Sequence, residues 1–304
     1  MRTRWLALVA VTASLAGGPT VLAQRVAPAP PVSMAVVQRE GSHRVVLTVE
    51  ALEAVEVAAD RRLLRAELRD ARGRAVRCTP SPPRTPARTV SLERGQRWSE
   101  WLDVRELCWG RALATLASVN EIRWSFDAGR ARGAWVARTP STAFRSIGPV
   151  VSAWRAPPAT SPDANAPIRV ELAAVDLAHR ARPVFRVRVV GASRGRAFVR
   201  HEAISFRVLT PSGRTFDCRL PAFGGRALPD FFARFAPGRA ISMSLDGEAY
   251  CGRFTEPGIH EVTPVLTLRE RGEAWGLEAV TGTFVGAPVP LRVRSRTYVE
   301  QPVE

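Results

Sequence analysis

Apolar and polar residues alternate along short stretches of this chain, with a period of two. The clearest stretches, rich in β-branched and aromatic residues, are 45–49, 185–190, 204–209, 241–245 and 283–285. A strand places successive side chains on opposite faces of its sheet, so this period is typical of half-buried strands. Turn-forming clusters such as Pro211–Arg214 and Glu256–Gly258 separate the stretches. The pattern therefore predicts an all-β protein with short antiparallel strands.

A spaced residue pattern occurs twice and indicates an internal duplication. In each copy an aspartate follows a glycine by eight residues, and a cysteine follows the aspartate by five. The two copies are Gly95, Asp103, Cys108 and Gly238, Asp246, Cys251. Several residue types that recur in one order across two halves of a chain are the signature of a repeat.

The stretch Leu52–Leu68 is ambiguous, because its content of Ala, Glu, Leu and Arg would also suit a helix. Its counterpart in the second copy, Val190–Val208, has the pattern of a strand, a loop and a strand. We therefore expect Leu52–Leu68 to be β as well. Strands of this length and spacing, in domains of about 120 residues, predict two-sheet antiparallel sandwiches.

The first 23 residues have the organisation of a secretory signal peptide. Arg2 and Arg4 give a positive start, and the apolar run Trp5–Leu15 is too short to span a bilayer. Val21–Ala23 is a small-residue cleavage signature. We expect export to the periplasm or the extracellular space. We expect no membrane span after signal cleavage, because no later stretch is long and apolar enough.

The four cysteines are expected to form two disulfides. An even number of cysteines in an oxidising compartment is typical of a disulfide framework. Four cysteines allow three connectivities, and the duplication selects Cys78–Cys108 and Cys218–Cys251. The alternative, a metal site, lacks the close cysteine pairs and nearby histidines of zinc ligands. We expect no metal and no cofactor.

Two proline-rich segments mark the expected domain boundaries. Residues 24–33 form a lead-in and residues 156–166 form a linker, since proline at this density prevents both helix formation and strand pairing. We expect domain one at residues 34–155 and domain two at residues 167–298, followed by a tail at residues 299–304.

The formal net charge is +16, and all 44 basic residues are arginine. This usage is typical of a GC-rich genome, and the arginines are dispersed rather than clustered. In stretches such as 185–189 and 291–294 they alternate with apolar residues, which indicates that the arginines lie on the solvent-exposed faces of strands. Nucleic-acid binding is therefore not expected. Attraction to anionic polymers such as cell-surface polysaccharide is an unspecific consequence of the charge.

The order of turns and strands in the second half resembles a known family. Residues 235–246 run from a Pro-Gly turn into an alternating strand that ends in Leu-Asp, and Pro257–Val262 opens another strand after a second Pro-Gly. This order resembles the immunoglobulin- or fibronectin-like modules of secreted bacterial proteins. The resemblance covers most of domain two and, more faintly, domain one. It implies two tandem antiparallel immunoglobulin-like β-sandwiches, with one disulfide each. The chain departs from the family at His260, where a tyrosine is usual.

Motifs of catalysis do not occur in the sequence. It has no nucleophile elbow, zinc-protease helix, phosphate loop or dinucleotide fingerprint. The histidines are isolated from one another and are expected in loops or at strand ends: His43, His179, His201 and His260. Asp103 and Asp246 lie at corresponding strand ends and are expected to cap turns. We therefore expect no catalytic activity.

Two tryptophans of the first copy form the candidate ligand surface. Trp101 aligns with Ser244, and Trp109 aligns with Gly252. The second copy has small residues at both positions. The two indole rings therefore either pack against the other domain or the disulfide, or form an exposed patch that recognises a sugar or a protein. The prediction is a secreted structural or adhesion-type binding protein, with cell-surface polysaccharide or another secreted protein as partner. A proteinase-inhibitor-like module and an accessory domain of a secreted enzyme system remain alternatives.

Overall fold

The structure is a computed structural model, and the residues that it describes are 31–70, 72–78, 88–126, 147–158, 163–173, 175–177, 182–221 and 228–294. The predicted signal peptide at 1–23, the tail at 299–304 and His179 lie outside the described residues. Within the described part, no helix is long and apolar enough to cross a membrane.

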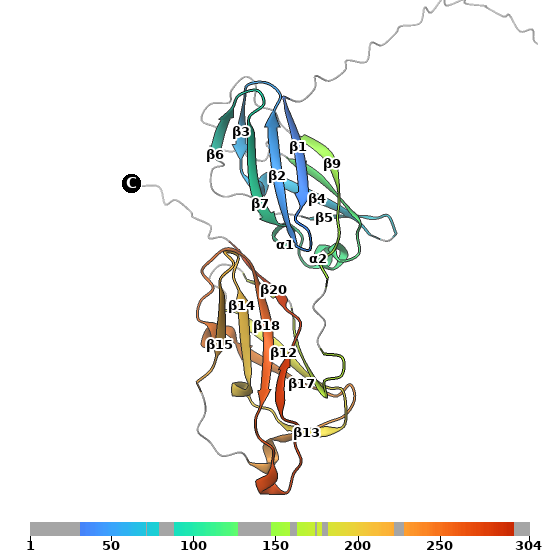
Figure 1. Cartoon of the computed structure of the whole chain (residues 1–304), viewed down its shortest axis with the longest axis vertical. Helices are drawn as coiled ribbons and strands as arrows, with labels where there is room; N and C mark the ends of the chain where they lie inside the picture. The colour runs from blue at the N-terminus through green and yellow to red at the C-terminus, as the bar shows by residue number, and fades with distance from the viewer. Residues whose placement is uncertain are drawn as a thin grey trace, which may run out of the picture. The chain divides into compact units, whose positions relative to one another are not determined.

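The N-terminal half (residues 31–158) is built from short strands in three sheets (Figure 1). The strands are β1 (Val32–Gln38), β2 (Arg44–Ala51), β3 (Val55–Ala59), β4 (Leu64–Arg69), β5 (Ala75–Cys78), β6 (Arg88–Leu92), β7 (Arg97–Asp103), β8 (Glu121–Phe126) and β9 (Ile147–Ala153). The sheet orders are β1-β2-β7, β3-β6 and β5-β4-β8-β9, and every pair is antiparallel. Short helical segments are η1 (Arg61–Leu63), α1 (Val104–Leu107) and α2 (Arg111–Leu116).

The C-terminal half (residues 163–294) has a corresponding arrangement. Its strands are β10 (Ile168–Leu172), β11 (Val175–Leu177), β12 (Val184–Gly191), β13 (Gly195–Phe198), β14 (Ile204–Leu209), β15 (Thr215–Arg219), β16 (Phe232–Phe235), β17 (Ala240–Asp246), β18 (Gly258–Leu268), β19 (Gly282–Val285) and β20 (Val289–Val293). They form sheets in the orders β10-β12-β17, β13-β16 and β11-β20-β18-β14-β15, with β19 on β18. The helical segments are η3 (His201–Ala203), η4 (Pro229–Phe231), α3 (Gly247–Cys251) and η5 (Glu273–Trp275).

Each half has its own hydrophobic core. The first core contains buried side chains from Val32 to Trp154, and the second contains buried side chains from Ile168 to Val293. Alternation along the strands builds both cores. Strand β2, for example, directs every second residue inward, and Leu47 and Val49 are fully buried there.

The repeated glycines of the sequence pattern have a conformational role. Gly95 and Gly238 precede β7 and β17, and both have positive φ, at 81° and 79°. A side chain strains this left-handed backbone, whereas glycine adopts it freely. The amides of Gly95 and Gly238 donate to the carbonyls of Ala51 and Gly191, which ties equivalent turns to the ends of β2 and β12.

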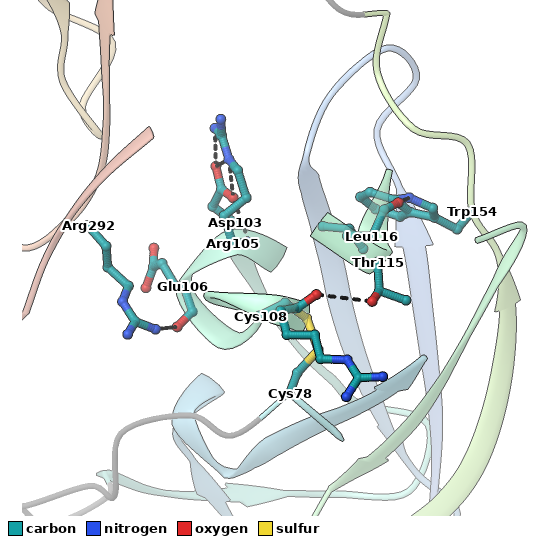
Figure 2. The surroundings of a disulfide bond; sticks show 10 residues. Cys78, Asp103, Arg105, Glu106, Cys108, Thr115, Leu116, Trp154 and Arg292 are labelled. Carbon is teal, nitrogen blue, oxygen red and sulfur yellow. Dashed lines mark hydrogen bonds and ion pairs between the residues drawn. A yellow bond between two sulfur atoms is a disulfide. The ribbon is translucent and has the colours of Figure 1, made fainter. Parts of the chain in front are cut away.

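Both predicted disulfides are confirmed. Cys78 is bonded to Cys108, and Cys218 is bonded to Cys251. In each half the bridge joins a strand of one sheet to the short helix that follows a strand of another sheet. Figure 2 shows the first bridge beneath α1.

The strand predictions are confirmed, and the structure adds three details. Leu52–Leu68 contains β3, the single turn η1 and most of β4, so it is not one helix. Strand β1 begins at Val32, inside the predicted lead-in, because Val32 is buried in the first core. The expectation of only antiparallel pairs is wrong at β11 and β20, which pair in parallel.

Candidate functional site

The outer face of the β1-β2-β7 sheet carries a row of apolar side chains. The register places Val37 opposite Val46 and Val46 opposite Trp101, so the three side chains lie side by side. Val37 is 63% exposed and Trp101 is 52% exposed, while Val46 is half-buried. The neighbouring residues Val45 and Leu102 point the other way and are buried in the core. We call this row the Trp101 face.

Polar groups continue the Trp101 face along the strands. The hydroxyl oxygens of Thr48 and Ser99 lie 3.0 Å apart and share a hydrogen bond. One further step along, Arg97 Nε donates to Glu50 Oε2 at 2.9 Å. The face therefore combines an open apolar ring with hydroxyl and charged groups beside it.

Arg61 fixes the strand edge that carries Trp101. Its guanidinium donates to the carbonyl of Trp101 at 3.0 Å and lies within ion-pair distance of Glu100 and Glu106, at 3.7 and 3.5 Å. Burial raises the pKa of the Glu106 carboxyl, and the charge of Arg61 opposes that rise. Trp101 is therefore held on a defined strand rather than on a loose loop.

The equivalent face of the C-terminal half is polar. On its β10-β12-β17 sheet, Arg186 lies opposite Ser244, and Arg188 lies opposite Ser242. Arg188 also pairs with Glu171 at 3.1 Å. The sandwich thus forms without a ring at this place, so folding alone does not require the exposed indole of Trp101.

The second predicted tryptophan has different surroundings. Trp109 is half-buried between α1 and α2, and the guanidinium carbon of Arg292 lies 4.8 Å from the centroid of its ring. Arg292 also donates to the carbonyl of Glu106 at 3.3 Å, as Figure 2 shows. Within the described residues, the rings of Trp101 and Trp109 do not contact each other. Trp101 therefore lies on an open sheet face, and Trp109 packs against an arginine.

Asp103 and Asp246 serve as helix caps. Asp103 accepts from the amide of Arg105 at the start of α1, and Asp246 accepts from the amides of Glu248 and Ala249 at the start of α3. The predicted capping role is confirmed, although the capped elements are short helices rather than turns.

Arg105 of α1 is a buried arginine, and only 8% of its surface is exposed. Its Nε and Nη2 donate to the two carboxylate oxygens of Asp103, and its Nη1 donates to Glu261 at 2.9 Å. Burial lowers the pKa of nearby His43, and the positive charge of Arg105 lowers it further. The carboxylates of Asp103 and Glu261 thus accept from all three nitrogens of this guanidinium.

The remaining histidines lie in separate elements. His201 begins η3, and His260 is buried in β18. Within the described ranges, no three residues among His, Cys, Asp and Glu are grouped so that they could hold a metal ion.

Sequence patterns identified Trp101 but missed its neighbours Val37 and Val46. Their row depends on the register of three strands that are far apart in the chain, and alternation within one strand does not fix that register. No protein-family model matches this chain, and no curated protein matches it.

Proposed function

We propose that this chain is an exported, non-catalytic binding protein made of two tandem immunoglobulin-like modules, and that its ligand binds on the Trp101 face. The exposed indole of Trp101 is the observation that carries the proposal. Burying an aromatic ring is favourable by about 1.5–3 kcal/mol, so a ring left 52% exposed on a rigid strand favours a binding role.

A cell-surface polysaccharide is the ligand class that fits this face best. A sugar ring has an apolar face and a rim of hydroxyl groups. The indole of Trp101 with Val37 and Val46 matches the apolar face, and Thr48 and Ser99 provide hydroxyl partners next to it. Few polar groups beside an apolar platform are typical of small-molecule and sugar sites.

Export is supported by two independent features. The two disulfides need an oxidising compartment to form and persist. The N-terminal segment has the charge and apolar pattern of a signal peptide.

The test is the substitution Trp101→Ser, which introduces the residue found at Ser244. We expect binding to insoluble cell-wall polysaccharide from the producing cells, measured by co-sedimentation, to weaken by roughly tenfold or more. The melting temperature should change little, because the ring is largely in water. Val151→Ser is the matched control, since Val151 is 50% exposed on β9, in a different sheet of the same half.

Two results would contradict the proposal. In one, Trp101→Ser binds the polysaccharide as well as the unaltered protein does. In the other, it unfolds several kcal/mol more easily, which would identify the ring as structural. If the unaltered protein binds a secreted protein instead, and Trp101→Ser abolishes that binding, the face is correct and the ligand class is wrong.

A further inference from the structure

A positively charged hollow lies in the C-terminal half, beside the antiparallel strand pair of β13 and β16. Strand β13 is labelled in Figure 1. Its volume is about 660 Å³. Three arginines line it, Arg194, Arg196 and Arg234, together with one acidic residue, Glu278. We call it the arginine hollow.

Two of these arginines oppose each other directly. Arg196 and Arg234 are partners in the antiparallel register, so both side chains leave the same face of the β13-β16 strand pair. Like charges at opposed positions destabilise a strand pair. Among the described residues, none of the three guanidinium groups has an ion pair or a hydrogen bond. By contrast, Arg188 and Arg207 of the same half pair with carboxylates at 3.1 and 3.4 Å.

Backbone contacts hold the walls of the arginine hollow in place. The amide of Val280 donates to the carbonyl of Arg196 at 2.8 Å, which ties the loop after η5 to strand β13. The amide of Leu277 donates to the carbonyl of Gly272 at 3.0 Å. A Cβ on Gly272 would lie 3.1 Å from the ring of Phe232, so this loop packs closely on β16. The arginines therefore project from a preorganised frame.

Aromatic rings lie next to the opposed arginines. Two residues along from Arg196, on the same face, Phe198 lies opposite Phe232, with ring centroids 5.1 Å apart. The guanidinium carbon of Arg200 lies 5.7 Å from the ring centroids of both Phe198 and Phe231. Phe231 is 48% exposed. An aromatic cluster with one exposed ring therefore lies at one end of the same strand pair.

We propose that the arginine hollow binds the carboxylate or sulfate groups of an acidic polysaccharide. A guanidinium fork pairs with two oxygens of such a group at once. Three arginines line the hollow against the single carboxylate of Glu278, so its net positive charge favours an anion. A sugar chain that extends from the hollow along the strand pair meets the exposed ring of Phe231, which offers a surface for the apolar face of a further sugar residue. The volume lies within the range of small-ligand sites. The site does not depend on the Trp101 face, because it uses other residues in the other half.

The experiment compares two double variants of the full-length protein. Arg196→Gln with Arg234→Gln removes two positive charges from the hollow. Arg188→Gln with Arg207→Gln is the control, because it removes the same number of charges from arginines of the same half that pair with carboxylates. Binding of heparin oligosaccharide (sulfate) and oligogalacturonate (carboxylate) is measured by calorimetry at about 0.15 M salt. We expect the hollow variant to bind at least one probe tenfold more weakly or worse, and the control variant to stay within twofold of the unaltered protein.

Folding is monitored by circular dichroism and thermal melting. Removing two opposed charges should leave the melting temperature equal or higher. Arg194→Gln lies outside the strand pair and provides a second variant, also expected to weaken binding, should the double variant fail to fold.

Three outcomes would overturn the proposal. Equal weakening in both double variants would show attraction to net charge alone. If the unaltered protein binds neither sugar, an acidic polysaccharide is not the ligand of the hollow. Tighter binding of a DNA oligonucleotide or polyphosphate than of both sugars, sensitive to the same substitutions, would show that the hollow recognises phosphate chains.

Discussion

The surroundings of individual side chains decide their roles in this protein, as His260 illustrates. This histidine is 2% exposed, its ring lies 5.2 Å from that of Phe254, and its Nδ1 is buried without a hydrogen-bond partner among the described residues. Burial lowers its pKa below the usual 6.5, and the charge of Glu256 opposes that shift. There is therefore a pH range below 6.5 in which His260 is neutral in the folded protein and protonated in the unfolded chain.

A pH-dependent loss of stability follows from His260. Below pH 6.5 the unfolded chain binds a proton at this position that the folded chain resists, so the free energy of unfolding should fall as the pH drops from 7 to 5. In His260→Phe, which keeps a ring at this site, that fall should be smaller. Urea denaturation at the two pH values measures the difference.

His201 provides the control for this prediction, because it is an exposed histidine in the same half. His201→Gln should keep the pH dependence of the unaltered protein. An identical pH dependence in His260→Phe and the unaltered protein would show that another group is responsible.

A tyrosine contact ties α3 to η3. Tyr250 of α3 donates its hydroxyl to the carbonyl of His201 at 2.7 Å. Burial, followed by the charge of Glu202, raises the pKa of Tyr250 to about 12, so the hydroxyl keeps its proton. Sequence order alone did not reveal this contact, because the two residues are far apart in the chain.

At the level of elements, the two capped helices α1 and α3 have corresponding places but unequal surroundings. Asp246 accepts only from backbone amides of α3 and from no arginine among the described residues, whereas Asp103 caps α1 and also holds the guanidinium of Arg105. The Arg105 side chain is 10% exposed. Loss of Asp103 would leave this buried cation with Glu261 as its remaining carboxylate partner.

We therefore expect the two alanine substitutions to differ in cost. Asp246→Ala should lower the free energy of unfolding by about 0.5–2 kcal/mol, the usual effect of losing a helix cap. Asp103→Ala should cost more, up to about 3–5 kcal/mol, because it also breaks a buried ion pair. Urea denaturation of both variants gives the comparison. Equal costs would mean that Asp103 acts only as a cap.

Alternation of residues predicted the strands well, and other elements less well. Strands such as β2 and β12 are eight residues long and show a clear period of two. Helices α1 and α3 have only four and five residues, which is too short for a helical period to appear. The opposition of Arg196 and Arg234 was also not predictable, because it depends on how two distant strands pair.

At the scale of the whole molecule, few contacts connect the two cores. Arg44 donates to the carbonyl of Pro211 at 3.0 Å, Arg105 pairs with Glu261 at 2.9 Å, and Arg292 lies over Trp109. These contacts involve charged or polar side chains, and among the described residues the two clusters of buried apolar residues share no member. Polar contacts of this kind contribute modestly to stability compared with a complete core.

The C-terminal domain expected at residues 167–298 should therefore fold without the rest of the chain. Its core, its glycine turn and its Cys218–Cys251 bridge all come from its own residues. We expect this fragment to be soluble and β-rich and to melt cooperatively, as followed by circular dichroism with the disulfide verified by non-reducing mass spectrometry. A shorter fragment, 184–298, lacks β10 and should not fold, because Ile168 and Val170 are each 1% exposed and fill the core. A molten or insoluble 167–298 fragment with its disulfide formed would show that the second core needs the first.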